Sequence, residues 1–271
     1  MARIGFIQHR LGRTDGVSLE VDKFRRVLEK AGHEVFYLAG NQDVPGGEYI
    51  PGNYGGSFFG RVTLREALAN SLNIPAVKIL YIAGLNNTIA LAERLGISTL
   101  TDRNRYGLSL VLGGGEVQLL ELTGAFAVFA NDGVKSAVSG VRSIEGVTGN
   151  VLGEFRSEPQ RVLDSDIARM MNDMLSDNSA GERVFGSSSN LFLPERPVAA
   201  KTGTTQSYRD GWTVGYTPDI AVGVWTGNND NRPMRPGAAG LYVASPLWNE
   251  YMRYALNRFP NTPFLNPPEV E

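Results

Sequence analysis

VAAKTGTTQSYRDGWTVGYTP, residues 198–218, places one lysine between a run of small apolar residues and a glycine-threonine stretch. After the lysine the pattern is that of a strand, a turn and a second strand. Pro218 and Asp219 then form a good tight turn before IAVGVWTGN, residues 220–228, which reads as a further strand. The stretch therefore predicts antiparallel strands, with the lysine near one strand end.

The tetrapeptide Lys201-Thr202-Gly203-Thr204 has a chemical logic of its own. An ammonium group attracts an anion, a glycine lets a substrate approach the backbone, and two hydroxyls offer hydrogen bonds. Such a strand suits a peptide that carries a carboxylate. The alternative is an ordinary surface strand with a solvated lysine, because a bare Lys-Thr-Gly tripeptide is common.

Helical patterns dominate the chain before this hairpin, and one more helix follows it. Thr63 is placed to cap the first of them, and Pro75 ends that helix or starts the next. Helices surrounding an antiparallel hairpin predict an α+β domain. The expected helices are VTLREALANSLN (62–73), PAVKILYIAG (75–84), TIALAERLG (88–96), QLLELTGAFAVFANDG (118–133), DSDIARMMNDMLSD (164–177) and SPLWNEYMRYALNRF (245–259).

The N-terminal residues have a different character. RIGFI (3–7) and HEVFYLAG (33–40) read as strands, and SLEVDKFRRVLEKAG (18–32) reads as an amphipathic helix between them. Glycine, proline and asparagine then become frequent, which indicates a junction. The sequence predicts a β-α-β segment over residues 1–41 and a larger domain over residues 42–271.

Composition excludes several function classes. Lys and Arg number 26 against 28 Asp and Glu, so no basic surface points to nucleic acid. The chain has no cysteine, and its two histidines, His9 and His33, are too far apart in sequence to suggest a metal cluster. The glycines of LGGGEV lack a following Gly-Lys-Ser/Thr, so no phosphate-binding loop and no cofactor is expected. No uncharged apolar run reaches about 18 residues, and no signal peptide or membrane span is expected in the chain.

A second motif precedes the lysine. Ser71 and Asn73, in NSLN, can direct a hydroxyl and an amide into one cleft, although alone they are more typical of local capping. Ser-x-Asn followed by Lys-Thr-Gly makes two of the three motifs of penicillin-recognising serine acyltransferases. The surrounding stretches closely resemble the transpeptidase domain of class A penicillin-binding proteins over about residues 43–267. They are YIPGNYGGSFFGRVTLREALANSLNIPAVKIL, GLSLVLGGGEVQLLELTGAFAVFANDG, RPVAAKTGTTQSYRDGWTVGYTPDIAVGVWTGNND and ASPLWNEYM.

This resemblance implies a β-lactamase/penicillin-binding transpeptidase-like fold and a peptidoglycan D,D-transpeptidase activity. In that family a serine attacks the penultimate D-Ala carbonyl of a stem peptide and releases D-Ala. An amine of a neighbouring strand then captures the acyl-enzyme, which closes the cross-link in the cell wall. β-Lactams mimic the donor and acylate the same serine. The family works outside the cytoplasmic membrane, tethered by an N-terminal helix.

Family roles can be carried over position by position. The resemblance makes Ser71 the proton-relaying serine and Asn73 the amide that holds the substrate backbone. Lys201 would support the relay electrostatically, and Thr202 and Thr204 would lie near the substrate carboxylate. The backbone N–H of Thr204 would be one oxyanion donor, a contribution worth roughly 10²–10³ in rate.

The family's nucleophile motif, Ser-x-x-Lys, is not found. Residue three before each lysine is Glu20, Val27, Pro75, Asp132 or Val198, never serine. Without the nucleophile and its base, covalent catalysis loses the step they supply. We therefore expect an incomplete transpeptidase domain that is inactive in this chain, with a truncated or joined N-terminus.

Two other functions stay open. One is a non-catalytic remnant that binds stem peptide or β-lactam reversibly through Lys201, Thr202, Thr204 and Asn73. The other is a sugar-nucleotide glycosyltransferase fragment, because residues 1–41 resemble the opening of a GT-B type glycosyltransferase. Covalent against reversible labelling separates the first of these from an active transpeptidase. The sequence leaves the oligomeric state open.

Overall fold

The hairpin around Lys201 forms the centre of the domain. The computed structural model describes residues 3–11, 34–42, 51–53 and 56–268. Three antiparallel strands lie in the order β7-β8-β9, with Lys201 opposite Val214 and Val214 opposite Gly223. A turn closed by the Thr217 N–H and the Ile220 carbonyl joins the last two. The strands are β7 (Ala199–Thr204), β8 (Asp210–Tyr216) and β9 (Ala221–Gly227).

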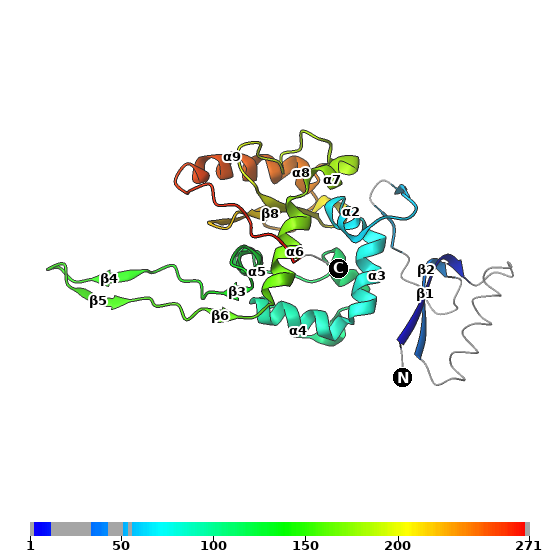
Figure 1. The fold of residues 1–271 in the computed structure, drawn as a ribbon, viewed down its shortest axis with the longest axis horizontal. Coiled ribbons are helices and arrows are strands. Elements are labelled where there is room, and N and C mark those ends of the chain that lie inside the picture. Colours follow the sequence, from blue (N-terminus) through cyan, green and yellow to red (C-terminus); the bar gives the residue numbers. More distant parts are fainter. Residues whose placement is uncertain (1–2, 12–33, 43–50, 54–55, 269–271) are drawn as a thin grey trace.

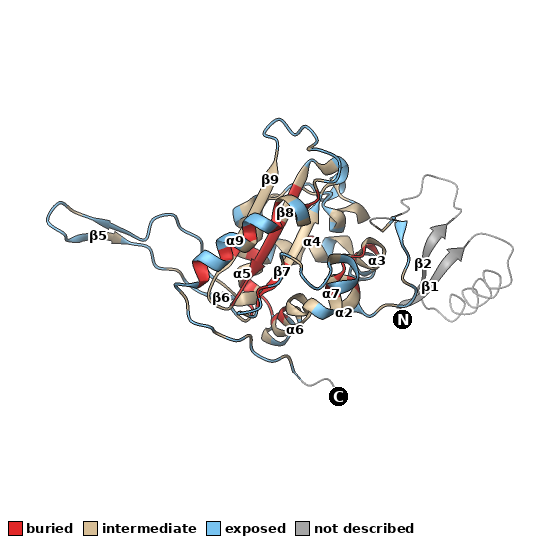
Figure 2. Cartoon of the chain, turned by 90° about the horizontal axis from the view of Figure 1, so that it is seen from above, coloured by how far each residue is buried: buried red, intermediate tan, exposed pale blue. Residues whose placement is uncertain are grey.

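Helices cover both faces of this sheet (Figure 1). Trp248 is fully buried against the middle of the sheet, and its Nε1 donates to the Val222 carbonyl at 3.1 Å. A Cβ at Gly215 would lie 2.3 Å from the Trp248 ring, so only glycine fits there. Figure 2 shows buried residues along β7, β8 and α9, and others on helices such as α3, whereas β9 is mostly intermediate. One face is covered by α5 (Leu119–Ala130) and α6 (Ser165–Ser176), the other by α8 (Gly240–Val243) and α9 (Ser245–Leu256).

A smaller core lies under the helices of the first half. Ile89, Ile97, Leu100 and Ala125 are its buried members, and Ala125 lies on α5, which also contacts β8 and β9. Five further elements complete this region: α2 (Leu64–Ala69), α3 (Asn73–Ala83), α4 (Leu85–Leu95) and the 3₁₀ turns η2 (Arg103–Arg105) and η3 (Leu108–Leu112).

The single helix expected over residues 62–73 is wrong. The structure ends α2 at Ala69 and starts α3 at Asn73, because Ser71 is left-handed (φ 54°) and Leu72 is extended. Pro75 lies within the first turn of α3, where its missing N–H leaves no intrahelical bond unmade. The helix α7 (Asn178–Phe185) was not expected.

A hairpin arm, residues 134–161, projects away from the domain (Figure 1). Its base is the pair β3 (Val134–Lys135) and β6 (Gln160–Arg161), and its outer part is β4 (Ser143–Glu145) with β5 (Val151–Glu154). Ile144, Val151 and Leu152 are more than half exposed on it. The sequence pattern had not indicated this arm.

The N-terminal strands are present as expected. β1 (Arg3–Leu11) and β2 (Glu34–Gln42) pair in parallel, and the helix expected over residues 18–32 lies outside the described residues. Across the described part of the chain, no single helix has both the length and the apolar composition to cross a membrane. The consecutive helices α3 and α4 reach that length only together, and they bend by 95° at their junction.

Candidate functional site

The two sequence motifs meet at one hydrogen bond. Lys201 Nζ donates to Ser71 Oγ at 2.6 Å, although 130 residues separate them in sequence. The same nitrogen donates to the Thr202 carbonyl at 2.9 Å. The structure therefore brings the serine of Ser-x-Asn to the lysine of Lys-Thr-Gly.

Regular strand geometry places Lys201. Each residue of β7 from Ala199 to Thr204 pairs with a residue of β8, and the opposite side of β7 carries no strand among the described residues. Because side chains alternate along a strand, Lys201 and Gly203 point to one face of the sheet while Thr202 and Thr204 point to the other. The strand thus presents a lysine on one face, two hydroxyls on the other, and between them a backbone edge that pairs with no described strand.

Ser71 is placed by the end of a helix. Its N–H donates to the Leu68 carbonyl at 3.1 Å, and the Leu72 N–H donates to the Ala67 carbonyl at 2.9 Å. These two bonds form a Schellman motif, in which the residue after the helix cap adopts a left-handed conformation. Ser71 has φ 54°, which fulfils that requirement without being glycine.

Burial changes the chemistry of Lys201. Removal from water disfavours the ammonium form and lowers the pKa of Lys201 to about 8. At neutral pH the group stays mainly protonated, so it can donate to Ser71 and attract an anion. It loses its proton far more readily than a solvated lysine.

Thr204 is held by the first residue of α8, which packs on the face of the sheet opposite to Lys201. Its Oγ1 accepts the Gly240 N–H at 2.9 Å, which leaves its own hydroxyl proton free to be donated. A Cβ on Gly240 would lie 2.3 Å from the Gly203 carbonyl oxygen, so glycine permits this close approach. Sequence reasoning did not identify Gly240, and its place in the loop-like GAAGLY stretch gave no signal for it.

The side chain of Asn73 hydrogen-bonds to Gly52, and no hydrogen bond to Ser71 or Lys201 is found for it among the described residues. As the first residue of α3, it donates from Nδ2 to the Gly52 carbonyl at 2.8 Å. Asn53 completes this link, because its Oδ1 accepts the Ile74 N–H at 3.2 Å. The amide expected to hold a substrate backbone is thus already bonded to the segment before α2.

A polar cluster behind β7 fixes the loop that follows it. Asp210 accepts from Thr205 Oγ1 at 2.8 Å and from Trp225 Nε1 at 2.8 Å. The indole nitrogen of Trp225, on β9, thus helps to hold the Asp210 carboxylate at the start of β8.

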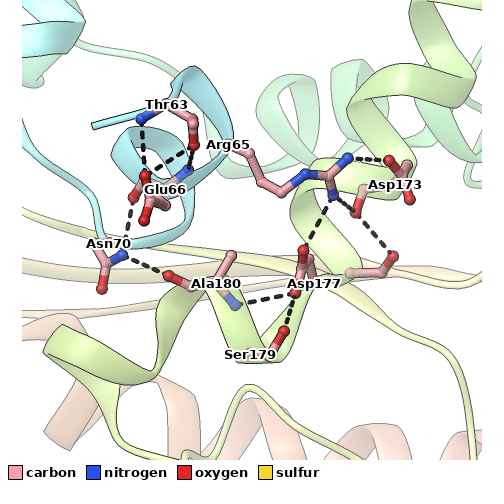
Figure 3. A network of polar contacts seen from close by, with 9 residues as sticks. Thr63, Arg65, Glu66, Asn70, Asp173, Asp177, Ser179 and Ala180 are labelled. Carbon is pink, nitrogen blue, oxygen red and sulfur yellow. Dashed lines mark hydrogen bonds and ion pairs between the residues drawn. The ribbon is translucent and has the colours of Figure 1, made fainter. Parts of the chain in front are cut away.

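Figure 3 shows the network that attaches α2 to α6 and α7. Arg65 forms ion pairs with Asp173 and with Asp177, which also caps α7. At the end of α2, Asn70 Nδ2 donates to the Ala180 carbonyl at 2.6 Å. Sequence reasoning missed Asn70, although it stands directly before Ser71 in the NSLN motif.

Comparison with known proteins assigns the family. A model of the penicillin binding protein transpeptidase domain matches residues 40–253, a span that includes Ser71, Asn73 and Lys201. The chain belongs to the penicillin-binding protein transpeptidase family. Penicillin-binding protein 1A of Aquifex aeolicus (strain VF5) is 36% identical over 224 residues, which cover 83% of this chain. The chain spans 30% of that protein's length.

Solved penicillin-binding proteins share the fold. Penicillin-binding protein 1A from Haemophilus influenzae aligns with a TM-score of 0.72 and 24% identity, over 83% of this chain and 39% of that one. The PonA1 protein from Mycobacterium tuberculosis, solved in complex with penicillin V, aligns with a TM-score of 0.69 and 26% identity, over 81% of this chain and 63% of that one. These likenesses confirm the expected α+β penicillin-binding transpeptidase fold. Across the described residues, no group of three or more His, Cys, Asp and Glu side chains could hold a metal ion.

Proposed function

We propose that this transpeptidase domain binds the D-Ala-D-Ala end of peptidoglycan stem peptides, and β-lactams that mimic it, without forming an acyl-enzyme. The observation that carries this proposal is the 2.6 Å contact of Lys201 with Ser71 beside the open edge of β7. In its family such a site takes part in cross-linking stem peptides. In this chain we expect the site to bind the peptide without cross-linking it.

The chemistry of the β7 edge supports this ligand class. An extended peptide can add to a free strand edge through backbone hydrogen bonds. Its terminal carboxylate would accept a hydrogen bond from the Thr204 hydroxyl, which Gly240 orients, and the Lys201 ammonium would attract that carboxylate across the strand edge. Thr202 and Gly203 would line the same edge, one with a hydroxyl and the other with free space.

Ser71 and Lys201 are arranged for proton relay. Because the ammonium donates to Ser71 Oγ, the serine's own proton can be donated to a departing amine while Lys201 replaces it. This relay serves a serine nucleophile that attacks the peptide, and no serine stands three residues before any lysine in the chain. Binding without acylation is therefore the function that these residues support.

Intact-mass spectrometry together with calorimetric titration of penicillin tests the proposal. We expect saturable binding with no mass added, and a loss of affinity of at least tenfold in Lys201→Ala. The control is Lys135→Ala, which removes a lysine from the base of the hairpin arm and should leave affinity unchanged.

Two outcomes would overturn this reading. A stable one-drug adduct that disappears in Lys201→Ala would show that another residue serves as nucleophile. No binding to a cooperatively folded sample, at any penicillin concentration tested, would remove the β7 edge as a ligand site.

A further inference from the structure

Ser71 holds an unusual backbone position for a functional serine. Its φ of 54° lies in the left-handed region, at the position of a Schellman motif that glycine usually occupies. The sequence gives the chain an easier alternative, because residues 62–73 have a continuous helical pattern. Some contact must therefore stop α2 and hold Ser71 in this conformation.

Asn70 provides such a contact, because its side-chain amide bonds on two sides. Nδ2 donates to the Glu66 carbonyl at 2.9 Å and to the Ala180 carbonyl at 2.6 Å, which uses both of its hydrogens. Oδ1 accepts the Val184 N–H at 3.0 Å. Asn70 is only 5% exposed, so water cannot readily replace these partners.

The packing of α7 supports this anchor. Gly181 brings α7 close to the end of α2, since a Cβ there would lie 3.3 Å from the Ala69 carbonyl oxygen. Leu72, the next residue after Ser71, is 7% exposed, and its N–H donates the second hydrogen bond of the Schellman motif, to the Ala67 carbonyl. Asn70 has φ −89° and ψ 5°, and its own N–H still donates to the Glu66 carbonyl. Its side chain therefore fixes the last helical position on α7, directly before the left-handed residue.

We propose that Asn70 is the positioning residue for Ser71. By fixing the end of α2 on α7, it holds Ser71 in the left-handed conformation and so keeps Ser71 Oγ against Lys201 Nζ. Its importance for ligand binding rests on the function proposed above, whereas the geometric claim and its test do not.

A double-mutant cycle at positions 70 and 71 tests the claim. Glycine tolerates the left-handed region and alanine does not, but glycine costs more entropy on folding. We therefore expect Ser71→Gly to have a folding equilibrium constant about fivefold above that of Ser71→Ala. In an Asn70→Ala background the ratio should fall below about twofold, because residue 71 is released from the left-handed region.

Arg65→Ala is the matched control. It removes another contact of α2 with α6 and α7 without touching the helix end, so the fivefold ratio should persist. A ratio that stays at about fivefold in Asn70→Ala would overturn the proposal, since a merely structural anchor shifts both variants equally.

Amide hydrogen exchange in the unmodified chain provides a second test if Asn70→Ala does not fold. The N–H groups of Ser71, Leu72 and Val184 should exchange through one shared opening, with protection factors within about threefold of one another. Protection of Val184 about 100-fold above that of Ser71 and Leu72 would overturn the coupling. Neither test uses a β-lactam, so failure of the proposed function and failure of this inference are distinguishable.

Discussion

Lys201 and Ser71 share one hydrogen bond, but the chain fixes their backbones in different ways. Lys201 lies in a regular strand that is paired along its length with β8 and covered on both faces by helices. Ser71 lies outside any regular element, as the one left-handed residue of the three that connect α2 and α3. The lysine is therefore positioned by the whole sheet, whereas the serine is positioned by a few local hydrogen bonds.

The difference indicates where the contact is sensitive. A change that disturbs β7 should affect the stability of the whole domain, because the strand belongs to the main core. A change at the end of α2 should displace Ser71 at a smaller cost in stability.

Gly240→Ala should disturb the packing on β7 and cause the largest loss of stability among these variants. The new Cβ would lie 2.3 Å from the Gly203 carbonyl oxygen and 2.6 Å from that of Trp212, and both are backbone atoms. Chemical denaturation should show a loss of about 1–3 kcal/mol. Gly153→Ala in β5 is the control, because nothing lies within 4 Å of its Cβ position. A fully stable Gly240→Ala would mean that α8 does not pack on β7 as closely as described.

The pH dependence of stability should report on the lysine. Since burial lowers the pKa of Lys201 to about 8, the unfolded chain binds more protons than the folded one above that pH. The free energy of unfolding should rise between about pH 8 and 10, by at most about 1.4 kcal/mol per pH unit. Above about pH 10 the buried Tyr216, whose pKa burial raises, acts in the opposite direction.

Lys201→Met should remove most of this rise while preserving the side-chain volume. Lys78→Met is the comparison, because burial also lowers the pKa of Lys78 and contributes with the same sign. Denaturation curves between pH 7 and 10 measure both variants. An unchanged slope in Lys201→Met would show that its ammonium is as well solvated in the folded chain as in the unfolded one.

Thr63→Ala should cause the smallest loss of stability. It tests whether the start of α2 influences the position of Ser71 after its end. Thr63 caps α2 by accepting the Glu66 N–H at 3.1 Å, at the opposite end from Ser71. Loss of the cap should cost about 1 kcal/mol, whereas Thr63→Ser should keep most of it. Because the Asn70 anchor is untouched, thermal denaturation should still show the advantage of glycine over alanine at position 71.

Sequence patterns predicted the regular side of this comparison well. Alternating residues and the Pro218-Asp219 turn located β8 and β9, and the Lys-Thr-Gly motif lies in β7 as expected. Helical spacing located α4, α5, α6 and α9 to within a few residues. These elements depend on local periodicity, which a single sequence contains.

The irregular side could not be predicted in the same way. The left-handed turn at Ser71 follows Asn70, whose side chain meets the Ala180 carbonyl and the Val184 N–H, and both partners lie about 110 residues away in sequence. The engagement of Asn73 by Gly52 likewise depends on where Gly52 and Asn53 lie against the start of α3, about 20 residues away in sequence. Such contacts are long-range, so periodicity carries no record of them.

The hairpin arm has a consequence for modularity. Because β3 and β6 pair at its base, residues 135 and 160 lie side by side, and the chain leaves and re-enters the domain at one point. The arm's length and sequence can therefore vary without moving Ser71 or Lys201. A label placed at its tip, where the Gly146 N–H donates to the Asn150 carbonyl, would report on what surrounds the domain and leave the Ser71–Lys201 contact unaltered.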